Sequence, residues 1–123
     1  MKTARKQTAQ SFLHLAATGK LDEAYALVAP AFRHHNPHFR GDAASLKEAM
    51  AAAAKQFPRT RIEFQRTVEE EDLVAVHSRV VHAPAGRDIA VVHIFRFEGQ
   101  AIAEPWDIAM EAPERSPNEH GLF

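Results

Sequence analysis

Hydrophobic residues recur at helical spacing in the first half of the chain and at every second position in the second half. Apolar side chains fall on one face in residues 3–17, 21–28 and 42–57, which is the spacing of helices that pack one side against a core. Gly19 is suited to end the first helix, and Asp42 is suited to cap the third. The pattern therefore predicts three helices before Pro58.

Beyond Pro58 the hydrophobic period falls from about 3.6 to 2, which is the alternation of half-buried strands. An acidic turn at residues 69–72 and a loop at residues 83–86 divide this half, and Pro105 favours an edge strand or a bulge. The predicted strands are residues 62–68, 73–82, 87–98 and 101–111. Helices followed by an antiparallel meander indicate an α+β fold, with the helices packed on one face of a curved sheet that encloses a pocket.

The two-residue turn at positions 99–100 predicts that a histidine and a carboxylate lie on neighbouring strands. In a regular hairpin closed by this turn, His93 faces Trp106 and lies diagonal to Asp107. An imidazole and a carboxylate at that spacing can form an acid/base pair for proton transfer. The same spacing is also typical of a structural His–Asp contact.

Composition narrows the classes of function that fit this chain. With 123 residues it is large enough for one core and too short for two, so we expect one domain spanning residues 1–123. A formal net charge of -1 argues against nucleic acid or an anionic membrane as a partner. The absence of cysteine excludes disulfides, thiolate nucleophiles and cysteine-ligated zinc. No apolar run approaches the roughly 18 residues of a membrane span, and we expect a cytoplasmic protein.

Four blocks of sequence resemble the SnoaL-like family, and they follow the family's order. They are similar to its Y-I-Q-H-N-P segment with a following glycine, its E-G-D-L-V-A-V-H, its F-R-F-E-N-G-K-I-V-E-H-W-D, and its P…N-x-N-G-M-F tail. In this chain the blocks are residues 32–37 with Gly41, residues 71–77, residues 95–107, and Pro113 with residues 118–123. The chain departs from the family at Pro105, where a histidine is usual.

The resemblance implies the nuclear-transport-factor-2-like fold: a cone of strongly curved antiparallel sheet with three helices around a deep pocket. It implies a homodimer formed through the sheet, a pocket for a small hydrophobic molecule, and a tail at residues 113–123 that closes over or near that pocket. Polyketide cyclases of the family close rings by aldol chemistry without a cofactor. Relatives include isomerases, dehydratases and proteins without known activity, so a non-catalytic ligand-binding or dimerisation module and an isomerase or dehydratase are alternatives.

The resemblance also assigns candidate catalytic residues. Cyclases of the family have histidine where His93 stands and aspartate where Asp107 stands. We expect Asp107 to remove a proton alpha to a carbonyl, while His93 orients the base or protonates the developing alkoxide. The alternative for Asp107 is a structural contact with an arginine or with the end of a neighbouring element.

The candidate substrate-binding residues are His35, Asn36, His77 and Trp106. The first two lie on a rigid turn between prolines, which the resemblance places at the pocket mouth, although an asparagine before proline also fixes a turn by itself. Of the two histidines on the second strand, we expect His77 and not His82 to face the pocket. Trp106 is suited to stack on a flat ligand, or to pack in the core.

Histidines at positions 34, 35 and 38 raise the question of a metal site. Neighbouring side chains on an extended segment point to opposite sides, so His34 and His35 are poorly placed to share an ion. The chain also lacks a His-Glu-x-x-His helix. We therefore expect no metal, and the resemblance implies that no cofactor is needed.

Overall fold

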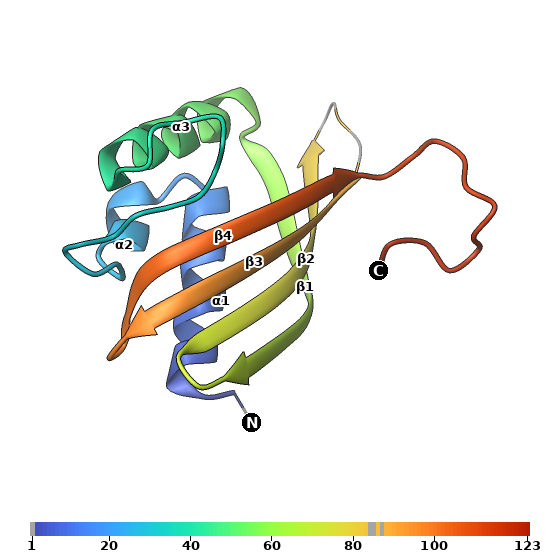
Figure 1. The fold of residues 1–123 in the computed structure, drawn as a ribbon. Helices are drawn as coiled ribbons and strands as arrows, with labels where there is room; N and C mark the ends of the chain where they lie inside the picture. The colour runs from blue at the N-terminus through green and yellow to red at the C-terminus, as the bar shows by residue number, and fades with distance from the viewer. Residues whose placement is uncertain (1, 84–85, 87) are drawn as a thin grey trace.

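The chain forms three helices followed by a four-stranded antiparallel sheet. The computed structural model describes residues 2–83, 86 and 88–123. Its elements are α1 (Ala4–Ala17), α2 (Leu21–Tyr25), α3 (Ala43–Gln56), β1 (Arg59–Glu70), β2 (Leu73–Ala83), β3 (Asp88–Glu98) and β4 (Ala101–Glu111). The strands pair in chain order, so β1 and β4 are the two edges (Figure 1). The predicted α+β class is confirmed.

Local chemistry explains where the helices begin and end. Asp42 caps α3 as predicted, because its carboxylate accepts a hydrogen bond from the Ser45 backbone N–H at 2.9 Å. The second helix is shorter than predicted, because the chain beyond it pairs with the edge of β4. Leu27 O accepts a hydrogen bond from Ile102 N at 3.0 Å, and Ala29 N donates to Ile102 O at 2.8 Å. These bonds hold residues 27–29 along β4.

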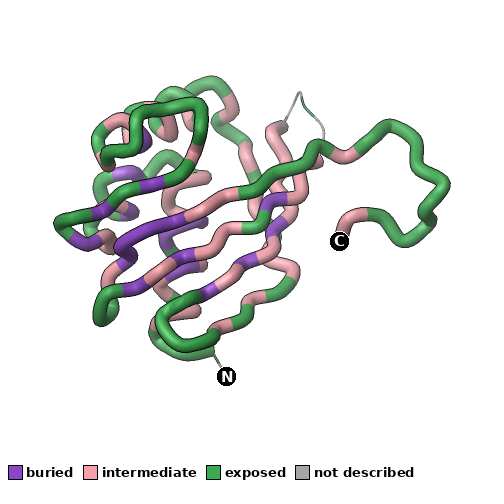
Figure 2. The backbone as a smooth tube through the Cα atoms, in the orientation of Figure 1, coloured by how far each residue is buried: buried purple, intermediate pink, exposed green. Residues whose placement is uncertain are grey.

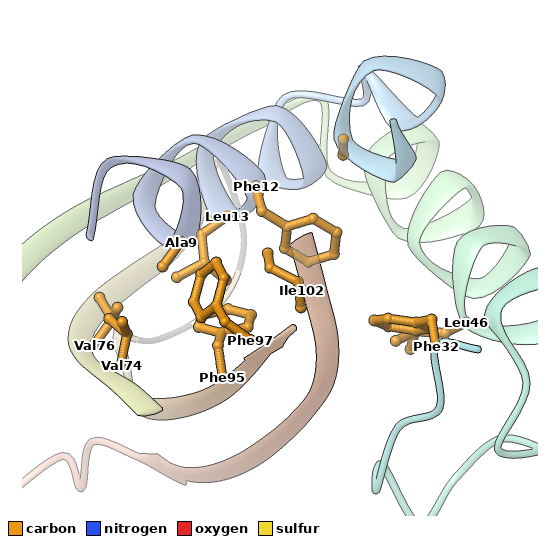
Figure 3. Packing of buried hydrophobic residues seen from close by; sticks show 11 residues of the cluster. Ala9, Phe12, Leu13, Phe32, Leu46, Val74, Val76, Phe95, Phe97 and Ile102 are labelled. Carbon is orange, nitrogen blue, oxygen red and sulfur yellow. The ribbon is translucent and has the colours of Figure 1, made fainter. Parts of the chain in front are cut away.

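One face of the sheet, which we call the inner face, packs on α1. Figure 3 shows α1 side chains meeting those of the strands, and the Phe12 and Phe95 rings lie 5.9 Å apart edge to face. Phe95, Val76 and Ile102 are completely buried there. At about 25 cal/mol per Å² of apolar area removed from water, this cluster is the main source of stability.

The strongly curved cone that the resemblance implies is not seen. The sheet is open and is not strongly curled, and the helices lie behind it as a second layer (Figure 1). Side chains of α1 fill the middle of the inner face, so the space left for a ligand is displaced toward one end of the sheet.

The other face of the sheet, the outer face, carries no helix in the described part of the chain. Figure 2 is viewed from this side and shows β4 changing from buried at its start to exposed at its end. Five large apolar side chains of this face are exposed: Val68, Leu73, Val92, Ile108 and Met110.

Part of the predicted loop at residues 83–86, and the predicted strand start at Arg87, fall outside the described residues. Among the residues that are described, no helix is long and apolar enough to cross a membrane.

Candidate functional site

His93 and Asp107 stand directly opposite each other on β3 and β4. The turn pairs Glu98 with Ala101 as predicted, but the register shifts by one residue between Phe97 and Arg96. A β-bulge that leaves Ala103 unpaired causes the shift. The prediction that Trp106 faces His93 is therefore wrong, and the carboxylate comes closer to the imidazole than a regular hairpin would place it.

The imidazole of His93 lies on the inner face and is held by its neighbours. Its ring stacks on that of Phe95, with centroids 5.8 Å apart and planes within 9°. Nδ1 is buried and has no hydrogen-bond partner in the described part of the protein. Burial lowers the pKa of His93 to about 4, and the negative charge of Asp107 opposes this only in part. The ring is therefore neutral at pH 7.

Asp107 is half-buried and is held by Asn36. The side-chain amide of Asn36 donates to Asp107 Oδ2 at 3.4 Å, a long hydrogen bond. The amide oxygen of Asn36 accepts from the His38 backbone N–H at 3.0 Å, and the backbone N–H of Asn36 donates to His34 Nδ1 at 3.1 Å. The turn thus fixes the asparagine, and the asparagine positions the carboxylate.

His35 and Trp106 lie on the outer side of β4, away from Asp107. Their rings stack with centroids 4.9 Å apart and planes within 4°. His35 Nε2 is 2.6 Å from Glu104 Oε2, and Glu104 faces Arg96 across the strands. Consecutive residues of the turn, His35 and Asn36, therefore straddle the edge strand, so the two predicted binding residues are not brought to one pocket.

Glu104 is a buried carboxylate that sequence reasoning missed. Its oxygens accept hydrogen bonds from Arg33 at 2.9 and 3.2 Å and from Arg96 at 3.0 Å, besides the contact with His35. Hydrogen bonding to Arg33, and then to His35, lowers the pKa of Glu104 to about 2, despite the cost of burial. Nothing in the sequence around Glu104 distinguishes it from a surface glutamate.

The expectation that His77 faces the pocket is not met, because His77 pairs with Val92 on the outer face. Its ring receives a hydrogen bond from Arg66 and stacks on Phe123, with centroids 6.0 Å apart. The last residue also lies 5.5 Å from the Arg79 guanidinium. The end of the tail at residues 113–123 therefore contacts the outer face and not the face that carries His93.

A cavity of about 170 Å³ lies on the inner face between α1, α3 and the strands. Among the described residues, its walls are apolar except for Thr60, His82 and His93. His82 is the histidine of β2 that faces this space. The alternation of β2 could have identified it, since His82 shares its parity with the buried Val74 and Val76. Asp107 lies beside the cavity and is not among its lining residues.

The described residues contain no group of three histidine, cysteine, aspartate or glutamate side chains arranged to hold a metal ion. Both ring nitrogens of His34, the first of the clustered histidines, already make hydrogen bonds within the protein. Its Nδ1 accepts from Asn36, so its Nε2 carries the proton that it donates to Arg40 O at 2.5 Å.

Comparisons of sequence and structure show which known proteins this chain resembles. A family model described as the SnoaL-like domain matches residues 9–104. A search of curated proteins gave no match. Solved structures with the same fold include a candidate polyketide cyclase from Bacillus cereus, with 22% identity, 87% of this chain and 74% of that chain covered, and a TM-score of 0.76.

A candidate ketosteroid isomerase from Kribbella flavida has 17% identity and a TM-score of 0.71, with 98% and 88% of the two chains covered. An NTF2-like protein of unknown function from Cytophaga hutchinsonii has 15% identity and a TM-score of 0.69, with 89% and 92% covered. At these identities the structures establish the shared fold.

We predict that Glu104→Gln lowers the free energy of unfolding by about 1–3 kcal/mol, because it removes the charge of a buried carboxylate that accepts hydrogen bonds from Arg33, His35 and Arg96. Urea unfolding at pH 7 measures the loss. Glu98→Gln is the matched control, since Glu98 binds the same Arg96 from an exposed position; we expect it to change stability by less than about 0.5 kcal/mol. Equal effects of the two substitutions on the free energy of unfolding would show that the charge of buried Glu104 stabilises the fold no more than that of exposed Glu98.

We also predict a loss of stability in acid that depends on His93. Between the ordinary pKa of 6.5 and about 4, the unfolded chain binds a proton that the folded chain does not, so the free energy of unfolding falls as the pH falls through this window. In His93→Gln the decrease from pH 7 to pH 5 should be smaller by up to about 2 kcal/mol. Urea titrations at both pH values test this, with His14→Gln on the exposed face of α1 as control. An unchanged decrease in His93→Gln would refute the assignment.

Proposed function

This chain belongs to the family of SnoaL-like domains, and from this premise we propose that it is a cofactor-independent enzyme that abstracts a proton from a small hydrophobic carbonyl compound. Aldol-type ring closure is the reaction that we favour. The catalytic residues in this proposal are Asp107 and His93.

One observation carries the proposal: the buried Nδ1 of His93 has no partner among the described residues and belongs to a ring that lines an apolar cavity. A buried polar atom without a hydrogen bond costs about 1–3 kcal/mol. Such atoms are rare and call for an explanation, and a catalytic role is one that accounts for the cost.

The two residues take different parts in the proposed reaction. Asp107, positioned by Asn36, accepts the proton from the carbon alpha to the carbonyl. Negative charge then develops on the carbonyl oxygen, and the neutral imidazole of His93 donates a hydrogen bond to it. Because the pKa of His93 is about 4, the ring acts at neutral pH as a hydrogen-bonding group and not as an imidazolium acid. His35 and Trp106 contribute indirectly, since they fix the turn that carries Asn36.

A second candidate function is non-catalytic binding of the same kind of molecule. The observation that favours it is the position of Asp107, which lies beside the cavity and does not line it. In that case His93 would bind a ligand without a base in reach. An isomerase or dehydratase would use the same base as the cyclase, with a different substrate.

We predict that the protein accelerates deuterium exchange at the alpha carbons of small aromatic and aliphatic β-dicarbonyl compounds, as followed by NMR in D₂O. Asp107→Asn keeps the shape of the side chain and removes the base, so exchange should fall by about 10²- to 10⁴-fold. Asp22→Asn, on the exposed surface of α2, is the matched control and should retain the wild-type rate.

Two outcomes would contradict this assignment. A wild-type rate in Asp107→Asn would exclude Asp107 as the base. Background exchange by the wild-type protein across the whole panel, together with measurable binding of the same compounds, would favour the non-catalytic candidate.

We further propose that the protein is a homodimer joined through the outer face of the sheet. The support is the group of exposed apolar side chains on that face, since contiguous exposed apolar patches mark interaction sites. Ile108 and Met110 are the most prominent on β4, with 69% and 57% of their surfaces exposed.

We expect wild-type protein to show the mass of two chains by light scattering coupled to size exclusion, and Ile108→Arg to show the mass of one. A buried, unpaired guanidinium at the interface disfavours association. Phe39→Arg, at an exposed apolar position of the turn away from the sheet, is the control and should remain dimeric. A single-chain mass for the wild-type protein would remove the dimer proposal.

A further inference from the structure

His82 is the second imidazole of the inner-face cavity, and the proposed reaction does not use it. It lies on β2 opposite Thr60 of β1, and both residues line the cavity that His93 also lines. The ring of His82 stacks on Phe57 with centroids 4.6 Å apart. The polar groups of the cavity therefore come from three neighbouring strands: Thr60 from β1, His82 from β2 and His93 from β3.

The hydrogen bonds of Thr60 fix which nitrogen of His82 carries the proton. The Thr60 hydroxyl donates its one hydrogen to Phe57 O at 2.8 Å, because a carbonyl oxygen only accepts. Toward His82 Nδ1, at 3.0 Å, the hydroxyl oxygen must then be the acceptor. Nδ1 of the neutral ring thus carries the hydrogen, and Nε2 has a free lone pair.

The walls of the cavity limit the charge of its ligand. None of the described residues that line it carries a formal charge at neutral pH when its histidines are neutral, and the carboxylate of Asp107 lies next to it. An anion would be desolvated there without a cationic partner among these residues, which is unfavourable. A neutral molecule loses much less solvation free energy when it enters the cavity.

The size of the cavity limits the size of the ligand. At about 170 Å³, it is close to the roughly 150 Å³ of an engineered apolar cavity that binds benzene. One six-membered ring fits this volume, and a polycyclic molecule would extend out of it.

We propose that His82 is a ligand-binding residue of this cavity, and that the ligand is a neutral, single-ring molecule whose enol or phenol hydroxyl donates a hydrogen bond to His82 Nε2. The inference goes beyond the proposed function and does not depend on it. A cyclic β-dicarbonyl compound in its enol form has the required donor.

Two substitutions of His82 distinguish the roles of its two ring nitrogens. Asparagine reproduces the Nδ1 donor toward Thr60 and lacks the Nε2 acceptor, whereas glutamine extends an amide oxygen to the region of Nε2. The probes are phenol and toluene, which have the same shape and differ in the hydroxyl, and benzoate as the anion. Calorimetric titration of each protein gives the ratio of the phenol and toluene dissociation constants, and long-range ¹H–¹⁵N spectra of the wild-type protein report which ring nitrogen is protonated.

We expect the preference for phenol relative to toluene to fall by about fivefold to tenfold in His82→Asn and to be largely kept in His82→Gln. The spectra should show the His82 proton on Nδ1. The same preference in His82→Asn as in the wild-type protein, or a proton on Nε2, would overturn the proposal. Tighter binding of benzoate than of phenol would overturn the neutral ligand class.

These measurements are independent of the exchange assay. A protein that binds phenol through His82 but exchanges no alpha protons would leave this site in place and remove the proposed activity. A protein that exchanges alpha protons with the Asp107 dependence described, but shows no His82-dependent preference, would keep the activity and remove this site.

Discussion

A single unpaired residue in β4, Ala103, determines which side chains of that strand meet His93. Because side chains alternate between the faces of a sheet, one extra residue exchanges the faces of everything that follows. Without the bulge, Trp106 would stand opposite His93 and Asp107 would point away from α1. The carbonyl of Ala103 also accepts a hydrogen bond from the Arg33 backbone N–H at 3.2 Å. The bulge therefore determines the site in two ways. It exchanges the faces of the β4 side chains that follow it, and its carbonyl holds the segment that carries Asn36.

The segment from Arg33 to Asn36 connects the two faces of the sheet at its edge. On the outer side, Glu104 binds Arg33 and His35, and the pKa of Glu104, lowered to about 2, shows how strongly its charged form is favoured. On the inner side, the next residue along the chain reaches Asp107. Because a turn between two prolines has little freedom, fixing His35 on one side also fixes Asn36 on the other. The buried carboxylate of Glu104, which does not line the cavity, thus contributes to the geometry of the site.

The sequence predicts the element order and the hairpin turn well, and it predicts the faces of individual residues less well. The turn at residues 99–100 and the alternation after it locate β4 at Ala101–Glu111, and the residue type of Asp42 identifies it as a helix cap, because both depend on neighbours in sequence. The bulge depends on which carbonyl of β4 a distant segment binds. The alternation of apolar and polar residues does not indicate which carbonyl that is. The choice of His77 instead of His82 had a different cause: it followed the family block, although the parity of β2 favoured His82. Glu104 was missed because its arginine partners are brought to it only by folding.

The chemistry open to His93 follows from a competition between burial and the charge of Asp107. Burial has the larger effect, so the imidazole stays neutral and does not form an imidazolium–carboxylate pair. Such a pair would neutralise the carboxylate and use the hydrogen bonds of both groups. With a neutral ring, Asp107 has no cationic partner among the described residues, and His93 retains a buried nitrogen without a partner among them. In the proposed reaction these are the two requirements of carbon-acid chemistry: a base whose negative charge is not neutralised, and a hydrogen-bonding group placed where the enolate oxygen forms. The desolvation that lowers the pKa of His93 is therefore also what keeps its role distinct from that of Asp107.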